Sequence, residues 1–166
     1  MDFTEFLKKL DIKLETYFKS QASSINCKKG CADCCKKGDY PLSDIELKHL
    51  MIGFQSLPSD KKIQVQANIK SMKKGEACPF LINDECSIYN YRPIICRVHG
   101  LAYLCTDNTV KLPYCTKDGK NFVTQFKNNE FIGQPILENL DTQEILKNFD
   151  YGEIRNLYDW CHPTNM

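Results

Sequence analysis

Long apolar runs are missing from this chain. The sequence begins Met-Asp-Phe-Thr-Glu-Phe-Leu-Lys-Lys, with a charge every few residues. It nowhere approaches the roughly 18 consecutive apolar residues of a membrane span. The beginning also lacks the basic start, apolar stretch and small-residue cleavage site of a secretory signal. We therefore expect no membrane association and a cytoplasmic location.

The chain also has no excess of charge of one sign. Lys and Arg total 22, Asp and Glu total 21, and the net charge is +1. Such a balance provides no general attraction to nucleic acid or to an anionic membrane, so neither is expected as a partner. No internal repeat or low-complexity tract divides the 166 residues, and we expect a single domain over residues 1–166.

Familiar catalytic arrangements are absent as well. The sequence carries no evident Ser/His/Asp set, phosphate-binding loop or pair of carboxylates placed for acid–base work. Whether the protein is an enzyme is therefore left open, and no catalytic residue is named. Histidine is scarce, with three residues. His99 is the best placed of them to join a metal site, since it follows Cys96 by three residues, but a hydrogen bond to the backbone is favoured for it.

Cysteine, by contrast, is abundant: the chain has ten, and four of them lie within nine positions. The spacing of these four is Cys-x3-Cys-x2-Cys-Cys, and four more follow at wider intervals. The eight residues are Cys27, Cys31, Cys34, Cys35, Cys78, Cys86, Cys96 and Cys115. Disulfides are one explanation, but they are rare in cytosolic chains, and pairing the two adjacent cysteines would need a strained ring. Short spacings in such a chain favour metal binding.

Thiolates are soft ligands that select zinc, copper(I) or iron–sulfur clusters. Four cysteines are a standard set for zinc and for iron–sulfur centres, so eight can fill two sites, or one site with spare thiols nearby. Adjacent Cys34 and Cys35 are expected to serve different metals, or to divide ligation and packing between them. Since four thiolates leave about two negative charges on a zinc site, flanking cations are expected to compensate: Lys28, Lys29, Lys36, Lys37, Arg92 and Arg97.

Two rival interpretations use the same cysteines. The spacing Cys27-x3-Cys31-x2-Cys34 is that of a radical SAM cluster, but Asp33 replaces the usual aromatic residue and 166 residues are too few for the large barrel. Cys31 and Cys34 also form the Cys-x2-Cys pair of a thiol oxidoreductase. That pair does not begin a helix that follows a strand, and Cys35 would interfere with two-thiol exchange.

Periodicity and capping signals predict the regular elements. Apolar residues at helical spacing predict a helix over residues 3–20. Ser43 and Glu46 form a capping box that starts a second helix, which Pro58 ends by residue 57. The remaining expected elements are a helix over 60–74 capped by Ser59, a hairpin turning at 83–85, a helical turn over 94–98, a strand or extended loop at 109–114, and a C-terminal helix over about 142–159 kinked at Gly152.

In these motifs the chain resembles the YkgJ-type cysteine-cluster family of zinc- or iron-chelating domains. The matching pieces are Cys27-x3-Cys31-x2-Cys34-Cys35, Cys78-Pro79-Phe80-Leu81, Cys86-Ser87-Ile88-Tyr89, Arg92-Pro93-x2-Cys96-Arg97, His99-Gly100-Leu101 and Cys115. The resemblance covers about residues 27–115, the motif core, and implies a metal-binding domain. Cys105 and Cys161 have no clear counterpart. A related domain occurs in enzymes that methylate flagellin lysines, where an iron–sulfur cluster is implied; methyltransferase activity is not carried over to this shorter chain.

Together these observations predict a mainly α fold, with helices around an irregular cysteine-rich metal-binding core and a small β-hairpin. The predicted function is metal binding through thiolates, with zinc or an iron–sulfur cluster as the bound species and the eight clustered cysteines as ligands. The alternative is an enzyme-class role, in which an iron–sulfur cluster transfers electrons or supports the modification of a partner protein. A metal ion is the partner that the sequence predicts.

Overall fold

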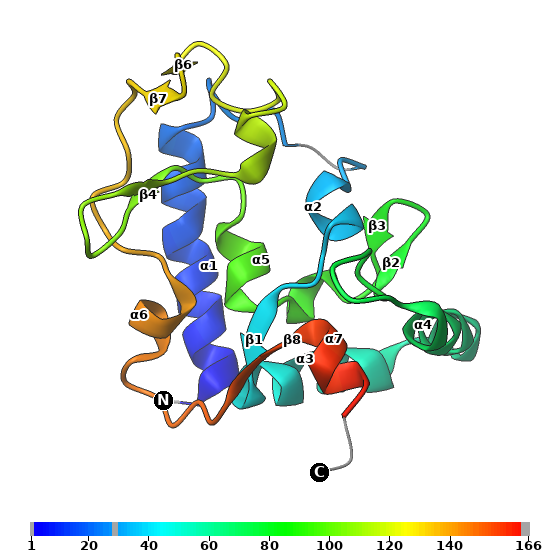
Figure 1. Ribbon diagram of the computed structural model, residues 1–166. Coiled ribbons are helices and arrows are strands. Elements are labelled where there is room, and N and C mark those ends of the chain that lie inside the picture. Colours follow the sequence, from blue (N-terminus) through cyan, green and yellow to red (C-terminus); the bar gives the residue numbers. More distant parts are fainter. Residues whose placement is uncertain (1, 28–29, 164–166) are drawn as a thin grey trace. The chain divides into compact units, whose positions relative to one another are not determined.

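The computed structural model describes residues 2–27 and 30–163 (Figure 1). Within the chain, residues group into two compact units. The first is Met1–Lys28 with Arg97–Phe149, and the second is Lys29–Cys96 with Asp150–Met166. Each unit is therefore built from two separate stretches of sequence. The single-domain assignment over 1–166 stays a prediction, and the two units are described below one at a time.

The first unit begins with the longest helix, α1 (Phe3–Ser20), which confirms the helix predicted over residues 3–20. Asp2 caps its start, since one carboxylate oxygen accepts hydrogen bonds from the amides of Thr4 at 2.7 Å and Glu5 at 3.1 Å. Apolar residues three or four positions apart share one face of a helix, and α1 buries its face through Leu7, Leu10 and Leu14.

Short hairpins make up much of the remaining first unit. β4 (Tyr103–Leu104) pairs with β5 (Val110–Lys111), and β6 (Phe126–Lys127) pairs with β7 (Glu130–Phe131). The predicted extended stretch at 109–114 is thus strand at its centre. A 3₁₀ turn, η2 (Tyr114–Thr116), precedes the second hairpin, and α6 (Thr142–Leu146) follows it.

The second unit is organised around two helices, α3 (Asp44–Ser56) and α4 (Ser59–Ser71). The helix predicted over 60–74 starts one residue early and stops at Ser71, since Met72 leaves helical geometry and buries its side chain. The core of this unit joins residues from both helices with residues that flank the cysteines. Its buried members are Leu42, Leu50, Val65, Met72, Phe80, Ile88 and Leu157.

The predicted capping box at the start of α3 is present, and it extends further than the sequence shows. One carboxyl oxygen of Glu46 accepts from the Ser43 amide at 2.8 Å and from its hydroxyl at 2.7 Å. The other accepts from the Ile94 amide at 2.7 Å. Glu46 is only 1% exposed, so a single buried carboxyl group ties α3 to α5 (Ile94–Val98), the predicted helical turn that carries Cys96.

Replacing Glu46 with alanine is expected to destabilise the protein by about 2–4 kcal/mol. The change removes a helix cap and leaves buried donors without their acceptor. Denaturant unfolding measures the loss. Glu15→Ala is the control, because Glu15 forms an exposed ion pair with Lys19 along α1, and such pairs contribute little. Equal unfolding midpoints for the two variants would contradict this role for Glu46.

A small hairpin forms where the sequence predicts one. β2 (Leu81–Ile82) pairs with β3 (Glu85–Cys86). Asn83 and Asp84 connect them with φ values of 51° and 59°. These are the left-handed values that a tight two-residue hairpin turn requires, and Asn and Asp tolerate them better than most residues.

The single C-terminal helix predicted over 142–159 is wrong. α6 ends at Leu146, the strand β8 (Ile154–Asn156) follows, and a short helix, α7 (Leu157–Cys161), ends the regular structure. In the second unit, β8 pairs antiparallel with β1 (Pro41–Ser43), and the Trp160 indole donates to the Leu42 carbonyl at 3.0 Å. Gly152 has a φ of +67°, which is incompatible with a helix continuing through it, and pairing with a distant segment outweighs local helical periodicity.

Helices account for 43% and strands for 12% of the structure. The predicted fold class is therefore confirmed in part: helices are the larger share, and the strands form small antiparallel pairs. The cysteine-bearing segments are largely irregular, with short elements alternating with turns. The metal-binding character predicted for that core is a separate matter, which depends on how the thiols lie.

Candidate metal centre

The ten cysteines, all within the described residues, are free thiols. They divide unequally between the two units. The first unit holds Cys27, Cys105 and Cys115. The second holds Cys31, Cys34, Cys35, Cys78, Cys86, Cys96 and Cys161. Six of the eight predicted ligands thus belong to the second unit, together with Cys161, which the motif had left out.

Adjacent Cys34 and Cys35 lie on a four-residue helix, α2 (Asp33–Lys36), and their sulfurs are 3.9 Å apart. The carbonyl of Cys35 accepts from the Cys78 amide at 2.7 Å, which brings the first cysteine cluster to the segment before the β2–β3 hairpin. Gly38 permits this approach. A Cβ there would lie 2.7 Å from the Cys35 carbonyl oxygen and 2.9 Å from the Cys78 Cβ, closer than side-chain atoms can pack.

The hairpin and α5 supply the next three thiols. Cys78 is linked to β2, because its carbonyl accepts from the Leu81 amide at 3.1 Å. Cys86 sits on β3 directly opposite Leu81. Cys96 lies in α5, where its amide donates to the Pro93 carbonyl at 3.1 Å. Cys78 and Cys86 also pack against the second unit's apolar core, so these thiols are placed by the same residues that stabilise the unit.

The pKa values show that these thiols are close enough to influence one another. The pKa of Cys78 is raised to about 12, first by burial and then by the charges of Cys86, Cys161 and Cys34. Burial also raises the pKa of Cys96, with added repulsion from Cys78, Cys86 and Cys34.

Cys34 and Cys35 share their contact unequally. The hydrogen bond between the two thiols lowers the pKa of Cys34 and raises the pKa of Cys35. Burial raises the pKa of Cys35 further. One sulfur of the pair is therefore the natural thiolate and the other its donor. Without a bound cation, mutual repulsion disfavours the thiolate form of the grouped thiols in the second unit. A bound cation would favour the thiolate form instead.

Arg92 is the expected cation that faces these thiols. Its guanidinium stacks 3.6 Å from the centre of the Tyr89 ring, and its Nε donates to the Tyr89 carbonyl at 2.9 Å. Its charge acts to lower the pKa of Cys34, Cys86 and Cys96. The guanidinium is therefore held by its own neighbours in a place where it offsets thiolate charge.

The other expected cations have different engagements. Lys36 pairs with Asp84 at 2.8 Å. Arg97 is buried in the first unit and pairs with Asp11 of α1, so it braces the helix. Lys28 and Lys29 lie outside the described residues. The sequence offers six cations that could compensate the charge of the thiolates. Of these, Arg92 is the one most directly assigned to that role.

The first unit brings Cys27 and Cys115 to one side chain that the motifs do not include. The amide nitrogen of Asn121 donates to the Cys27 sulfur at 3.1 Å and to the Cys115 sulfur at 3.3 Å. No pattern in the sequence marks Asn121, because its importance comes from a turn that returns it to Cys115. Cys105, by contrast, lies beside Thr109 and Asp141, and burial raises its pKa.

Thiols gather without forming a ready metal cage. Among the described residues, no group of three or more His, Cys, Asp or Glu side chains is placed to hold a metal ion. His99 packs with its ring centre 5.7 Å from that of Tyr114, and burial lowers its pKa, which favours the neutral ring. The donor chemistry fits zinc or an iron–sulfur cluster, and ligation would require the sulfurs to draw together.

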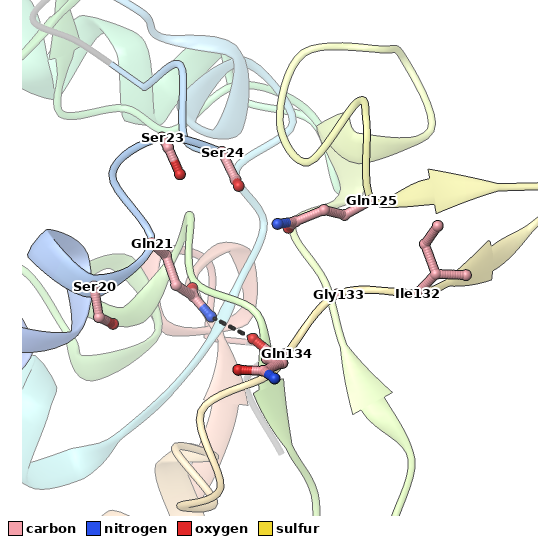
Figure 2. A pocket seen from close by; sticks show the side chains of 8 residues that line it. All are labelled: Ser20, Gln21, Ser23, Ser24, Gln125, Ile132, Gly133 and Gln134. Atoms are coloured by element: carbon pink, nitrogen blue, oxygen red, sulfur yellow. Dashed lines mark hydrogen bonds between the residues drawn. The ribbon is translucent and has the colours of Figure 1, made fainter.

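A polar cavity of about 340 Å³ lies elsewhere in the first unit, between the end of α1 and the segment after β7 (Figure 2). Figure 2 shows Gln21 reaching across to the backbone of Gln134, to which its Nε2 donates at 3.5 Å. None of the eight described residues that line the cavity is a cysteine, a histidine or a charged residue. It therefore offers no thiolate, imidazole or carboxylate ligand to a metal ion.

A family model matches residues 26–131, a span that contains all eight motif cysteines. The family is CxxCxxCC, described as "Putative zinc- or iron-chelating domain". The chain belongs to this family. Membership in the CxxCxxCC family supports metal binding as its general function, and confirms the resemblance drawn from the cysteine motifs.

No curated protein and no solved structure matches the chain. In the described part of the chain, none of the helices combines the length and the apolar character needed to cross a membrane. The assignment rests on the family model over residues 26–131.

Proposed function

We propose that this CxxCxxCC protein binds zinc or an iron–sulfur cluster through cysteine thiolates in the cytoplasm. The principal ligands come from the grouped thiols of the second unit: Cys34, Cys35, Cys78, Cys86 and Cys96. Cys27, Cys31 and Cys115 complete the proposed set. The single observation that carries this proposal is the grouping itself, in which a 2.7 Å backbone hydrogen bond joins Cys35 to Cys78 and the thiols shift one another's pKa.

Each protein group has a defined part in this proposal. Gly38 lets the first cluster approach Cys78, Glu46 holds the start of α5, and Arg92 offsets the charge of the thiolates. A thiolate-bound zinc would stabilise the fold, whereas an iron–sulfur cluster would supply one-electron chemistry. The all-thiol donor set suits both.

Zinc and iron–sulfur occupancy are distinguished by preparation without oxygen. We expect tightly bound metal in purified protein, because grouped free thiols in a zinc- or iron-chelating family have few other roles. Elemental analysis gives the metal and its amount, and an anaerobic sample gives the visible spectrum. Broad visible absorption with iron would identify a cluster, and a colourless sample with zinc would identify a zinc centre. Less than about a tenth of an equivalent of either metal, with these cysteines mapped as disulfides, would contradict metal binding.

A second candidate is an iron–sulfur component of a redox or protein-modifying enzyme. Its supporting observation is the exposure of Cys27 and Cys31, since electron transfer or action on a partner protein requires access from solvent. A colourless zinc protein under anaerobic conditions would weigh against this role. Reversible bleaching of the visible absorption by a reductant would support it.

A further inference from the structure

Asn121 is almost completely buried, at 1% exposure, and its side chain faces two sulfurs at once. Its Nδ2 lies 3.1 Å from the Cys27 Sγ and 3.3 Å from the Cys115 Sγ. An amide NH₂ group donates two hydrogen bonds and accepts none. Both sulfurs therefore accept hydrogen bonds in this arrangement, and both bonds come from the same amide group.

The direction of the Asn121 amide is determined by its other end. Its Oδ1 accepts from the backbone amide of Asn26 at 2.7 Å. A backbone N–H can only donate, so the oxygen must face Asn26 and the nitrogen must face the sulfurs. The flip ambiguity that affects many asparagine side chains is thereby resolved by chemistry.

The backbone around Asn121 also restricts its position. The Lys120 amide donates to the Cys115 carbonyl at 3.1 Å, which closes the turn between the second thiol and the asparagine. Phe122, the next residue, is 1% exposed and has a φ of +54°. Its amide donates to the Ser24 carbonyl at 2.7 Å. A bulky residue with positive φ is a rare, strained conformation of the kind that clusters at functional sites.

The sulfur of Cys27 has close neighbours on a further side as well. A Cβ built on Gly100 would lie 3.6 Å from the Cys27 Sγ and 3.3 Å from a ring carbon of Phe18. Gly100 has a φ of +108°, a value that glycine adopts readily and other residues rarely adopt. Backbone, aromatic ring and amide thus surround a thiol that remains accessible to solvent.

We infer that Asn121 is the positioning residue of a two-thiol metal-binding site formed by Cys27 and Cys115. This inference rests on the proposed metal-binding function and adds to it a polar group that the cysteine motif lacks. Donated N–H bonds stabilise sulfur as thiolate and orient it, which is how outer-shell partners tune metal–thiolate centres. The site takes a soft metal ion such as zinc, with further ligands from elsewhere.

Asn121→Asp is the sharpest test, because it keeps an oxygen for the Asn26 amide and replaces the nitrogen donor with an acceptor. The full-length protein is titrated with zinc alone, and the alkylation of each cysteine is followed by mass spectrometry. In the wild type, zinc should protect Cys27. In the variant, the zinc concentration needed for that protection should rise roughly 10- to 100-fold, the usual effect of losing an outer-shell partner.

Asn139→Asp is the matched control. Asn139 belongs to the same unit, its Nδ2 donates to the Thr106 hydroxyl at 2.7 Å, and the charge change is identical. It should leave the protection of Cys27 unchanged. Two further measurements on the Asn121→Asp protein separate positioning from stabilisation: its melting temperature without zinc and the alkylation of Cys105. If Asn121 had a purely structural role, the substitution would change both quantities.

Asn121→Ser is a second variant for the case in which the carboxylate prevents folding. Its shorter hydroxyl cannot reach both sulfurs, so a shift of about tenfold is expected. Unchanged zinc protection of Cys27 in a folded Asn121 variant overturns the positioning role while leaving metal binding intact. If zinc protects no cysteine of the wild-type protein, the proposed metal binding fails, and the Asn121 inference fails with it.

Discussion

Stripping the bound metal with a chelator should lower the melting temperature of the protein by about 10 °C. A ligand present at about 1,000 times its dissociation constant stabilises the folded state by about 4 kcal/mol. In a chain of this size each kcal/mol shifts the melting temperature by about 2–4 °C. Scanning calorimetry before and after chelation measures the change. The effect arises because only the folded chain groups these thiols, so the free energy of metal binding adds to the stability of the fold.

Two controls make the chelation experiment specific. Adding zinc back should restore the original melting temperature. A variant that cannot bind metal should melt at the same temperature with and without the chelator. If a sample that carries metal by elemental analysis melts identically after chelation, the metal does not contribute to the stability of the fold, and the structural role is wrong.

Replacing Cys96 with serine should reduce the bound metal to roughly half or less of the wild-type amount, since a thiolate site that loses one of its ligands is incomplete. Serine is close in size to cysteine, so packing changes little. Burial raises the pKa of Cys96, and Cys78, Cys86 and Cys34 raise it further, which places its sulfur among the grouped thiols. Metal content by elemental analysis and the melting temperature should fall together.

Cys105→Ser is the matched control for this change. Its thiol lies in the first unit beside Thr109 and Asp141, apart from the motif. Loss of that thiol should cost only local packing, on the order of 1 kcal/mol, with the full metal complement retained. Cys161→Ser should also retain the metal, although the structure places Cys161 close enough to influence Cys78. Metal loss in Cys105→Ser with retention in Cys115→Ser would show that the last ligand was assigned to the wrong cysteine.

Local signals were sufficient for several elements. α1 follows from the helical spacing of Leu7, Leu10 and Leu14, because periodicity acts within a few turns of chain. The start of α3 follows from Ser43 and Glu46, because a capping box is equally local. The β2–β3 hairpin follows from a turn whose residues tolerate positive φ. Each of these depends on neighbours in sequence, so a sequence can predict them.

Contacts between distant segments account for the elements that were missed. The predicted helix over 142–159 breaks because residues 154–156 pair with residues 41–43, and no local pattern marks a pairing across more than a hundred residues. The same limit applies to Glu46, whose capping role was predictable but whose bond to the Ile94 amide was not. Hydrogen bonds of this kind form between partners that only folding brings together.

The cysteine pattern by itself determined the family and its metal-binding chemistry, because thiol type and spacing are written directly in the sequence. Only the tertiary structure decided which groups accompany those thiols. It places the charge of Arg92 near Cys34, Cys86 and Cys96, and it aims Asn121 at the sulfurs of Cys27 and Cys115. The orientation of an amide depends on its distant hydrogen-bond donors and acceptors and on the backbone beside it, and neither is encoded by spacing along the chain.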